Sequence, residues 1–114
     1  MTEYFKLVRD GIPALIASQG KTCATRILDT EEYIEALRAK LREEAEEYFR
    51  EEEDRHALEE LADMLEVIRA LAVIHGGDSE MLEAIRAEKA ERRGGFKDRI
   101  LLLQTEGAAA DVQK

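Results

Sequence analysis

Two short acidic motifs contain the residues of this chain best suited to chemistry. The first is Glu43-Glu44-Ala45-Glu46-Glu47 and the second is Glu60-Leu61-Ala62-Asp63. Each motif has two acids three residues apart, and residues at i and i+3 lie next to each other on one face of an α-helix. Two such pairs on facing helices would offer only carboxylate oxygens, which suit Mg²⁺ or Mn²⁺. The spacing therefore indicates a divalent metal site, although solvated helices of an acidic chain also carry it.

The orientation of the first motif favours the metal site. At about 100° per residue, Glu44 lies about 20° from Leu37, within the apolar stripe of its segment. Glu47 lies about 80° from Leu37, at the border of the stripe, and Glu43 lies about 120° away, toward solvent. A buried carboxylate without a partner costs several kcal/mol or takes up a proton. A bound cation would remove that cost for Glu44.

The second motif lies on a segment that is apolar over most of its circumference. Relative to Leu61, Glu60 lies at about −100° and Asp63 at about −160°, in the same arc as Val67 and Leu71. Both acids are therefore expected to be partly buried. Glu44 with Glu47 and Glu60 with Asp63 then form two carboxylate pairs on neighbouring helices.

Basic residues offer the opposite charge. On the last predicted helix, Lys89 and Arg93 extend the apolar face that contains Ile85. Cations there either complement the negative helix C-terminus or, beside an acidic metal site, hold the phosphate groups of a ligand. Lys6 and Arg9 near the N-terminus would add to that positive charge.

Glycine and proline residues divide the chain into helical segments. We expect helices from Pro13 to about Ser18, from Asp29 or Thr30 to about Glu52, from near Asp54 to Gly76-Gly77, and from Asp78 or Ser79 to Gly94-Gly95. Residues 22–28 contain β-branched side chains and allow a short strand. Residues 96–103 are apolar enough to pack back, and residues 105–114 are expected to form a flexible tail. The prediction is one all-α domain over residues 1–104, a bundle of about four helices.

Composition limits the partners. The chain has 114 residues and a formal net charge of −9, and residues 31–66 hold 15 acids and 5 bases. Such a block repels nucleic acids and attracts cations. Without a signal pattern or an apolar run of about 20 residues, we expect a cytoplasmic protein that does not bind membranes. Cys23 is the single cysteine and cannot form an internal disulfide. The wide apolar arcs predict a homodimer or homotetramer.

The acidic motifs occur together with two further segments. These are Lys6-Leu7-Val8-Arg9-Asp10-Gly11-Ile12-Pro13 near the start, and Lys89 followed by Arg92-Arg93-Gly94-Gly95-Phe96. From about residue 4 to residue 103 the chain resembles the MazG-like, all-α nucleoside triphosphate pyrophosphohydrolases. It is most similar to their predicted house-cleaning branch, often described as phosphoribosyl-ATP pyrophosphohydrolase-like.

The resemblance implies a helical bundle that hydrolyses a noncanonical or surplus nucleoside triphosphate to the monophosphate and pyrophosphate. It implies Mg²⁺, with Mn²⁺ as a substitute, and commonly paired protomers. The implied metal ligands are Glu44, Glu47, Glu60 and Asp63, with Glu43 as a further catalytic candidate. Lys89 and Arg93 would hold phosphate oxygens, and Lys6 and Arg9 match the N-terminal signature of the branch.

Two other interpretations remain open. Phosphoribosyl-ATP itself could be the substrate, as in histidine biosynthesis, because that reaction uses similar acids. Alternatively, the chain could be a non-catalytic acidic helical module that binds a protein partner or senses a nucleotide.

Overall fold

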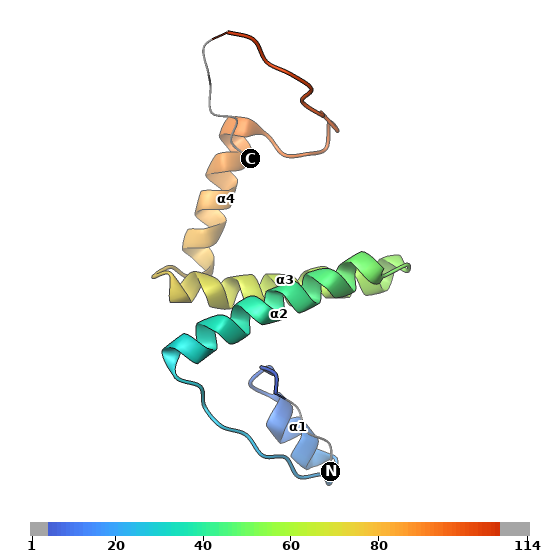
Figure 1. Ribbon diagram of the computed structural model, residues 1–114, viewed down its shortest axis with the longest axis vertical. Coiled ribbons are helices and arrows are strands. Elements are labelled where there is room, and N and C mark those ends of the chain that lie inside the picture. Colours follow the sequence, from blue (N-terminus) through green and yellow to red (C-terminus); the bar gives the residue numbers. More distant parts are fainter. Residues whose placement is uncertain (1–4, 108–114) are drawn as a thin grey trace.

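The computed structural model describes residues 5–107, and Figure 1 shows their arrangement. Within that range the chain is all-helical, as predicted, and contains no strand. The four helices are α1 (Ile12–Ser18), α2 (Thr30–Arg50), α3 (Asp54–Ile74) and α4 (Ser79–Arg93). None of them combines the length and the apolarity that a membrane crossing would require.

Local sequence signals explain where α2 begins. The side chain of Asp29 accepts a hydrogen bond from the backbone N–H of Glu32 at 2.9 Å, and the Glu32 side chain accepts one from the Asp29 N–H at 3.3 Å. This capping box satisfies two backbone donors at the helix start, and losing such a cap costs about 1 kcal/mol. Arg26 contacts the Glu32 carboxylate at 2.7 Å, and its hydrogen bond lowers the pKa of Glu32 to about 2. The extended chain before α2 is thereby tied to its first turn.

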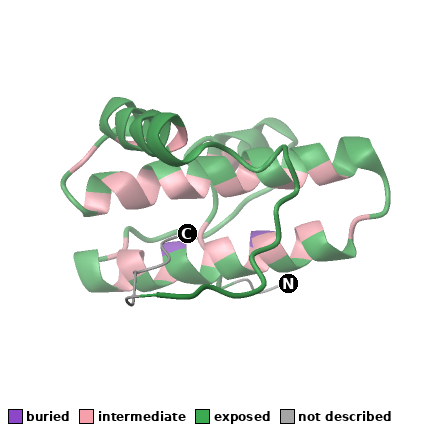
Figure 2. Ribbon diagram, turned by 90° about the horizontal axis from the view of Figure 1, so that it is seen from above, coloured by how far each residue is buried: buried purple, intermediate pink, exposed green. Residues whose placement is uncertain are grey.

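The long helices α2 and α3 form an antiparallel hairpin, because only residues 51–53 separate them (Figure 1). Half-buried residues lie along their facing sides, and the two buried positions among residues 5–107, Leu37 and Glu44, are both on α2 (Figure 2). Gly76 begins the turn between α3 and α4 with φ +81°, a conformation that glycine adopts without strain. Helix α4 then crosses the C-terminal end of α3 and projects away from the hairpin (Figure 1). The hairpin is therefore the element that positions the acidic motifs.

Two expectations about the connecting segments are wrong. Residues 22–28 are extended but form no strand, because no other extended segment of the described chain pairs with them. Residues 96–103 do not pack back on the helices, since Phe96 is 93% exposed and Leu103 is 84% exposed. They follow α4, which itself points away from the hairpin. The expected tail over 105–114 lies largely outside the described residues.

Candidate metal centre

The hairpin brings three of the predicted acids together. Glu44 and Glu47 lie one turn apart on α2, and Glu60 lies on the facing side of α3. Each contributes a carboxylate oxygen, and these three oxygens lie within 4.8 Å of one another. Because α2 and α3 run antiparallel from a short turn, residues that precede it in α2 meet residues that follow it in α3. We call Glu44, Glu47 and Glu60 the carboxylate cluster.

The cluster contains carboxylate oxygens that lack a hydrogen-bond partner. Glu44 is only 7% exposed, which confirms its predicted inward orientation. The Oε2 atoms of Glu44 and Glu60 are both buried and neither receives a hydrogen bond. Such orphaned acceptors are costly unless a proton or a cation occupies the space between them. The donor set contains only hard oxygen atoms and therefore fits Mg²⁺ or Mn²⁺.

The three carboxyl groups also change the acidity of Glu60. The neighbouring carboxyl group of Glu44 is the largest influence on its pKa, followed by burial and by the carboxyl group of Glu47. Together with the negative charges of both neighbours, these raise the pKa of Glu60 from 4.5 to about 7. Negative groups this close cannot all ionise freely. Without a metal the cluster therefore holds a proton in slightly acidic solution.

This proton predicts how the stability of the metal-free protein depends on pH. Since folding raises the pKa of Glu60, its contribution to stability is fully present below about pH 4.5 and is lost as the pH rises to about 7. The glutamine side chain in the Glu60→Gln variant carries no charge at any pH. We expect the melting temperature of wild type, followed by circular dichroism in a chelator, to fall relative to Glu60→Gln across this window. A constant difference between the two proteins would contradict the shared proton.

Lys40 is a member of the site that the sequence analysis missed. Its Nζ lies 3.7 Å from Glu43 Oε2 and 3.7 Å from Glu44 Oε1. The Lys40 side chain is only 21% exposed, so it supplies positive charge at the edge of the cluster. Its position could have been found from its spacing, because Lys40 lies one helical turn before both acids on α2. Glu43 itself lies outside the carboxylate cluster.

The fourth predicted ligand, Asp63, has a different partner. Asp63 Oδ1 accepts a hydrogen bond from Arg9 Nη2 at 2.7 Å and lies outside the group of three. The Asp63 side chain is 40% exposed and the Arg9 side chain 57%, so the pair lies near the surface. Arg9, a cation of the predicted N-terminal signature, thus contacts Asp63 of the second acidic motif.

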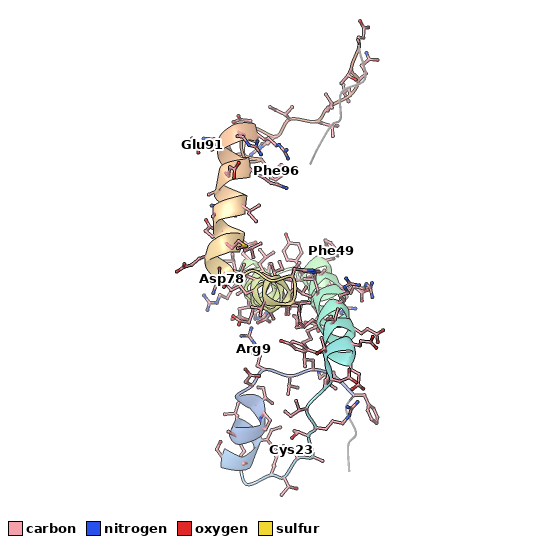
Figure 3. The ribbon with its side chains drawn as sticks, turned by 90° about the vertical axis from the view of Figure 1, so that its left-hand side faces the viewer. Arg9, Cys23, Phe49, Asp78, Glu91 and Phe96 are labelled. Atoms are coloured by element: carbon pink, nitrogen blue, oxygen red, sulfur yellow. The ribbon has the colours of Figure 1, made fainter. Side chains whose placement is uncertain are left out.

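The structure does not bring Lys89 and Arg93 to the carboxylate cluster within one chain. Both lie in the last turns of α4, beyond the point where it leaves α3. Figure 3 shows this separation: Glu91 of α4 and Arg9 lie on opposite sides of the hairpin. Their predicted contact with phosphate would require a different position of α4 or a second chain.

Comparisons with family models, with curated proteins and with solved structures give no match. The class of this protein is therefore described only by the geometry of its fold and its candidate site. This is an all-α protein whose central helical hairpin presents a carboxylate cluster.

Proposed function

We propose that this chain is a Mg²⁺-dependent hydrolase that cleaves a nucleoside triphosphate, of a noncanonical or surplus kind, into the monophosphate and pyrophosphate. The observation that carries the proposal is the pair of buried, unpartnered oxygens of Glu44 and Glu60 within a group of three carboxylates. A solvated acidic helix face would leave these oxygens hydrated. The motif spacing and the N-terminal and C-terminal signatures support the choice of reaction.

In this proposal Glu44, Glu47 and Glu60 hold the metal, and Asp63 joins them when Arg9 releases it. When bound, Mg²⁺ supplies positive charge that neutralises phosphate oxygens and acidifies water. Lys40 already holds Glu44 through one oxygen and leaves the other facing the cluster. This division would leave Oε2 of Glu44 available to hold the ion.

The chain's own residues account for the remaining steps. The oxygen of a water molecule attacks the α-phosphorus, and the bond from that phosphorus to the bridging oxygen breaks. The electron pair leaves with pyrophosphate, and the proton of the water passes to a carboxylate that is not fully used by the metal, for which Glu43 is our candidate. Arg9, which contacts Asp63 of the second acidic motif, would hold phosphate oxygens and stabilise charge on pyrophosphate.

The test is product release from a panel of canonical, deaminated, oxidised and deoxy nucleoside triphosphates, with phosphoribosyl-ATP included. We expect pyrophosphate and the monophosphate in equal amounts, only with Mg²⁺ or Mn²⁺. Glu47→Gln should lose at least about 100-fold in rate, because it removes one charged ligand, whereas Glu46→Gln, on the exposed side of the same turn, should remain active.

Each other outcome has a definite meaning. Turnover of phosphoribosyl-ATP alone would assign the histidine-pathway reaction. No turnover of any substrate would favour the non-catalytic binding module. Equal activity of wild type and Glu47→Gln would overturn the assignment of the acids.

A further inference from the structure

Residues 5–29 precede the hairpin and form an arm that is held to it by charge more than by packing. Helix α1 of this arm packs against none of the other three helices and contains no buried residue. The arm lies on the opposite side of the hairpin from α4 (Figure 1). Segments with few buried apolar contacts open at a low free-energy cost. The arm can therefore move while the hairpin keeps its shape.

The end of the arm that leads into α2 is firmly attached. Arg26 donates two hydrogen bonds to the carboxylate of Glu32, at 3.1 and 2.7 Å. A guanidinium that engages both oxygens of a carboxylate fixes the geometry as well as the distance. The capping box of Asp29 with Glu32 adds to this attachment. This end is therefore the hinge of the arm.

The other end is attached through Arg9, where the arm approaches the hairpin (Figure 3). Nη2 of Arg9 donates one hydrogen bond to Oδ1 of Asp63 at 2.7 Å, and both side chains are in contact with solvent. An exposed ion pair of this kind changes an equilibrium constant by about 5-fold at most. A ligand with a modest preference for Asp63 or for Arg9 is therefore sufficient to separate them.

Asp63 has a second place to go, because the carboxylate cluster is its neighbour. Asp63 follows Glu60 by three residues, so the two side chains lie on one face of α3. Rotation about the side-chain bonds of Asp63 changes its partner without changing the helix. In the metal-free cluster three acids repel a fourth, which favours the contact with Arg9. With a divalent cation in the cluster, two positive charges compete against the single charge of Arg9.

We propose that Arg9 is a positioning residue that holds Asp63 outside the carboxylate cluster in the metal-free chain, and that Asp63 leaves Arg9 for the cluster when a divalent cation is bound there. The arm then loses its attachment at Asp63 and moves about its hinge. The freed guanidinium of Arg9 becomes available to the phosphate groups of a triphosphate. This exchange sets the order of binding, with the cation first and the triphosphate second. The inference rests on the proposed function, which supplies both ligands.

The first measurement follows the position of the arm. Spin labels are attached in a Cys23→Ser background to Ala14→Cys and Glu66→Cys, which lie at exposed positions of α1 and α3. Pulsed electron paramagnetic resonance gives the distance between the two labels, with labelled chain diluted into unlabelled chain so that distances within one chain are measured. We expect one narrow distribution in a chelator and a second, broader one with millimolar Mg²⁺. Asp63→Asn should give the second distribution without Mg²⁺.

The second measurement is the Kd for Mg²⁺ of the full chain, by isothermal titration calorimetry. Arg9→Gln should lower this Kd by about 2- to 5-fold, because Asp63 no longer has a competing partner. In the Asp63→Asn protein the same replacement of Arg9 should leave the Kd unchanged, because no carboxylate remains to be released. Arg38→Gln is the matched control. Arg38 is exposed on α2, and its side chain makes no hydrogen bond or ion pair within residues 5–107.

The results separate this inference from the proposed function. A protein that binds Mg²⁺ without any change in the label distance would overturn the inference and leave the proposed function in place. A protein that binds no Mg²⁺ would overturn both. A higher Kd in Arg9→Gln would show that Arg9 supports the site and does not compete for Asp63. An equal decrease of the Kd in Arg38→Gln, or in Arg9→Gln without Asp63, would assign the effect to long-range charge and exclude the exchange.

Discussion

Glu60→Gln should abolish Mg²⁺-dependent pyrophosphate release and at the same time make the metal-free protein harder to unfold. The amide removes a charged ligand from the carboxylate cluster, and several kcal/mol of transition-state stabilisation corresponds to a rate loss of about 1,000-fold or more. Above pH 7 the same change removes repulsion from Glu44 and Glu47, whose proximity raises the pKa of Glu60 to about 7. The melting temperature in a chelator should therefore rise by several degrees.

Glu66→Gln is the matched control for this prediction. Glu66 lies on the exposed side of α3, and its side chain makes no hydrogen bond or ion pair within residues 5–107. Its replacement should change neither the rate nor the melting temperature. Opposite effects of Glu60→Gln on activity and on stability would identify a functional site, since replacing a merely structural residue would lower both. A less stable Glu60→Gln protein would show that the three carboxyl groups do not repel one another in solution.

Millimolar Mg²⁺ should raise the melting temperature of the wild-type protein by about 10 °C. A ligand that binds only the folded state adds about 2.7 kcal/mol when present at 100 times its Kd. For a chain of this length, each kcal/mol shifts the melting temperature by about 4 °C. The buried oxygens of Glu44 and Glu60, which have no hydrogen-bond partner, would supply the binding energy for the ion.

The control for Mg²⁺ must separate binding of the ion at the cluster from screening of charges by dissolved salt. NaCl at the same ionic strength weakens repulsion among exposed charges without occupying the cluster, and it should give a much smaller shift. Glu44→Gln should lose most of the response to Mg²⁺, because Glu44 is the buried member of the cluster. Equal shifts in NaCl and MgCl₂ would mean that these acids do not hold a divalent ion.

Helical periodicity predicted the elements that carry the site. The bounds of α2, α3 and α4 lie within about two residues of the expected ones, because a capping Asp29, a capping Asp78 and the glycines at 76 and 94 mark them. The angular position of Glu44 relative to Leu37 predicted its burial. Both signals depend only on residues close together in the sequence, so they do not depend on how the helices pack against one another.

Tertiary contacts could not be predicted in the same way. An apolar arc that extends over most of α3 does not specify which side α2 will cover, so the exposure of Leu58, Leu61 and Leu65 was not foreseen. The ion pair of Arg9 with Asp63 joins residues far apart in the chain, and spacing along one helix carries no information about it. The direction of α4, which separates Lys89 from the cluster, depends on the turn at Gly76 and on packing against α3.

The three-residue connection between α2 and α3 has a consequence for folding kinetics. Glu44 and Glu60 meet when a segment of fewer than twenty residues closes on itself, and such short closures are among the fastest steps available to a chain. The acids should accordingly come together early in chain collapse, before the more distant contact of Arg9 is made.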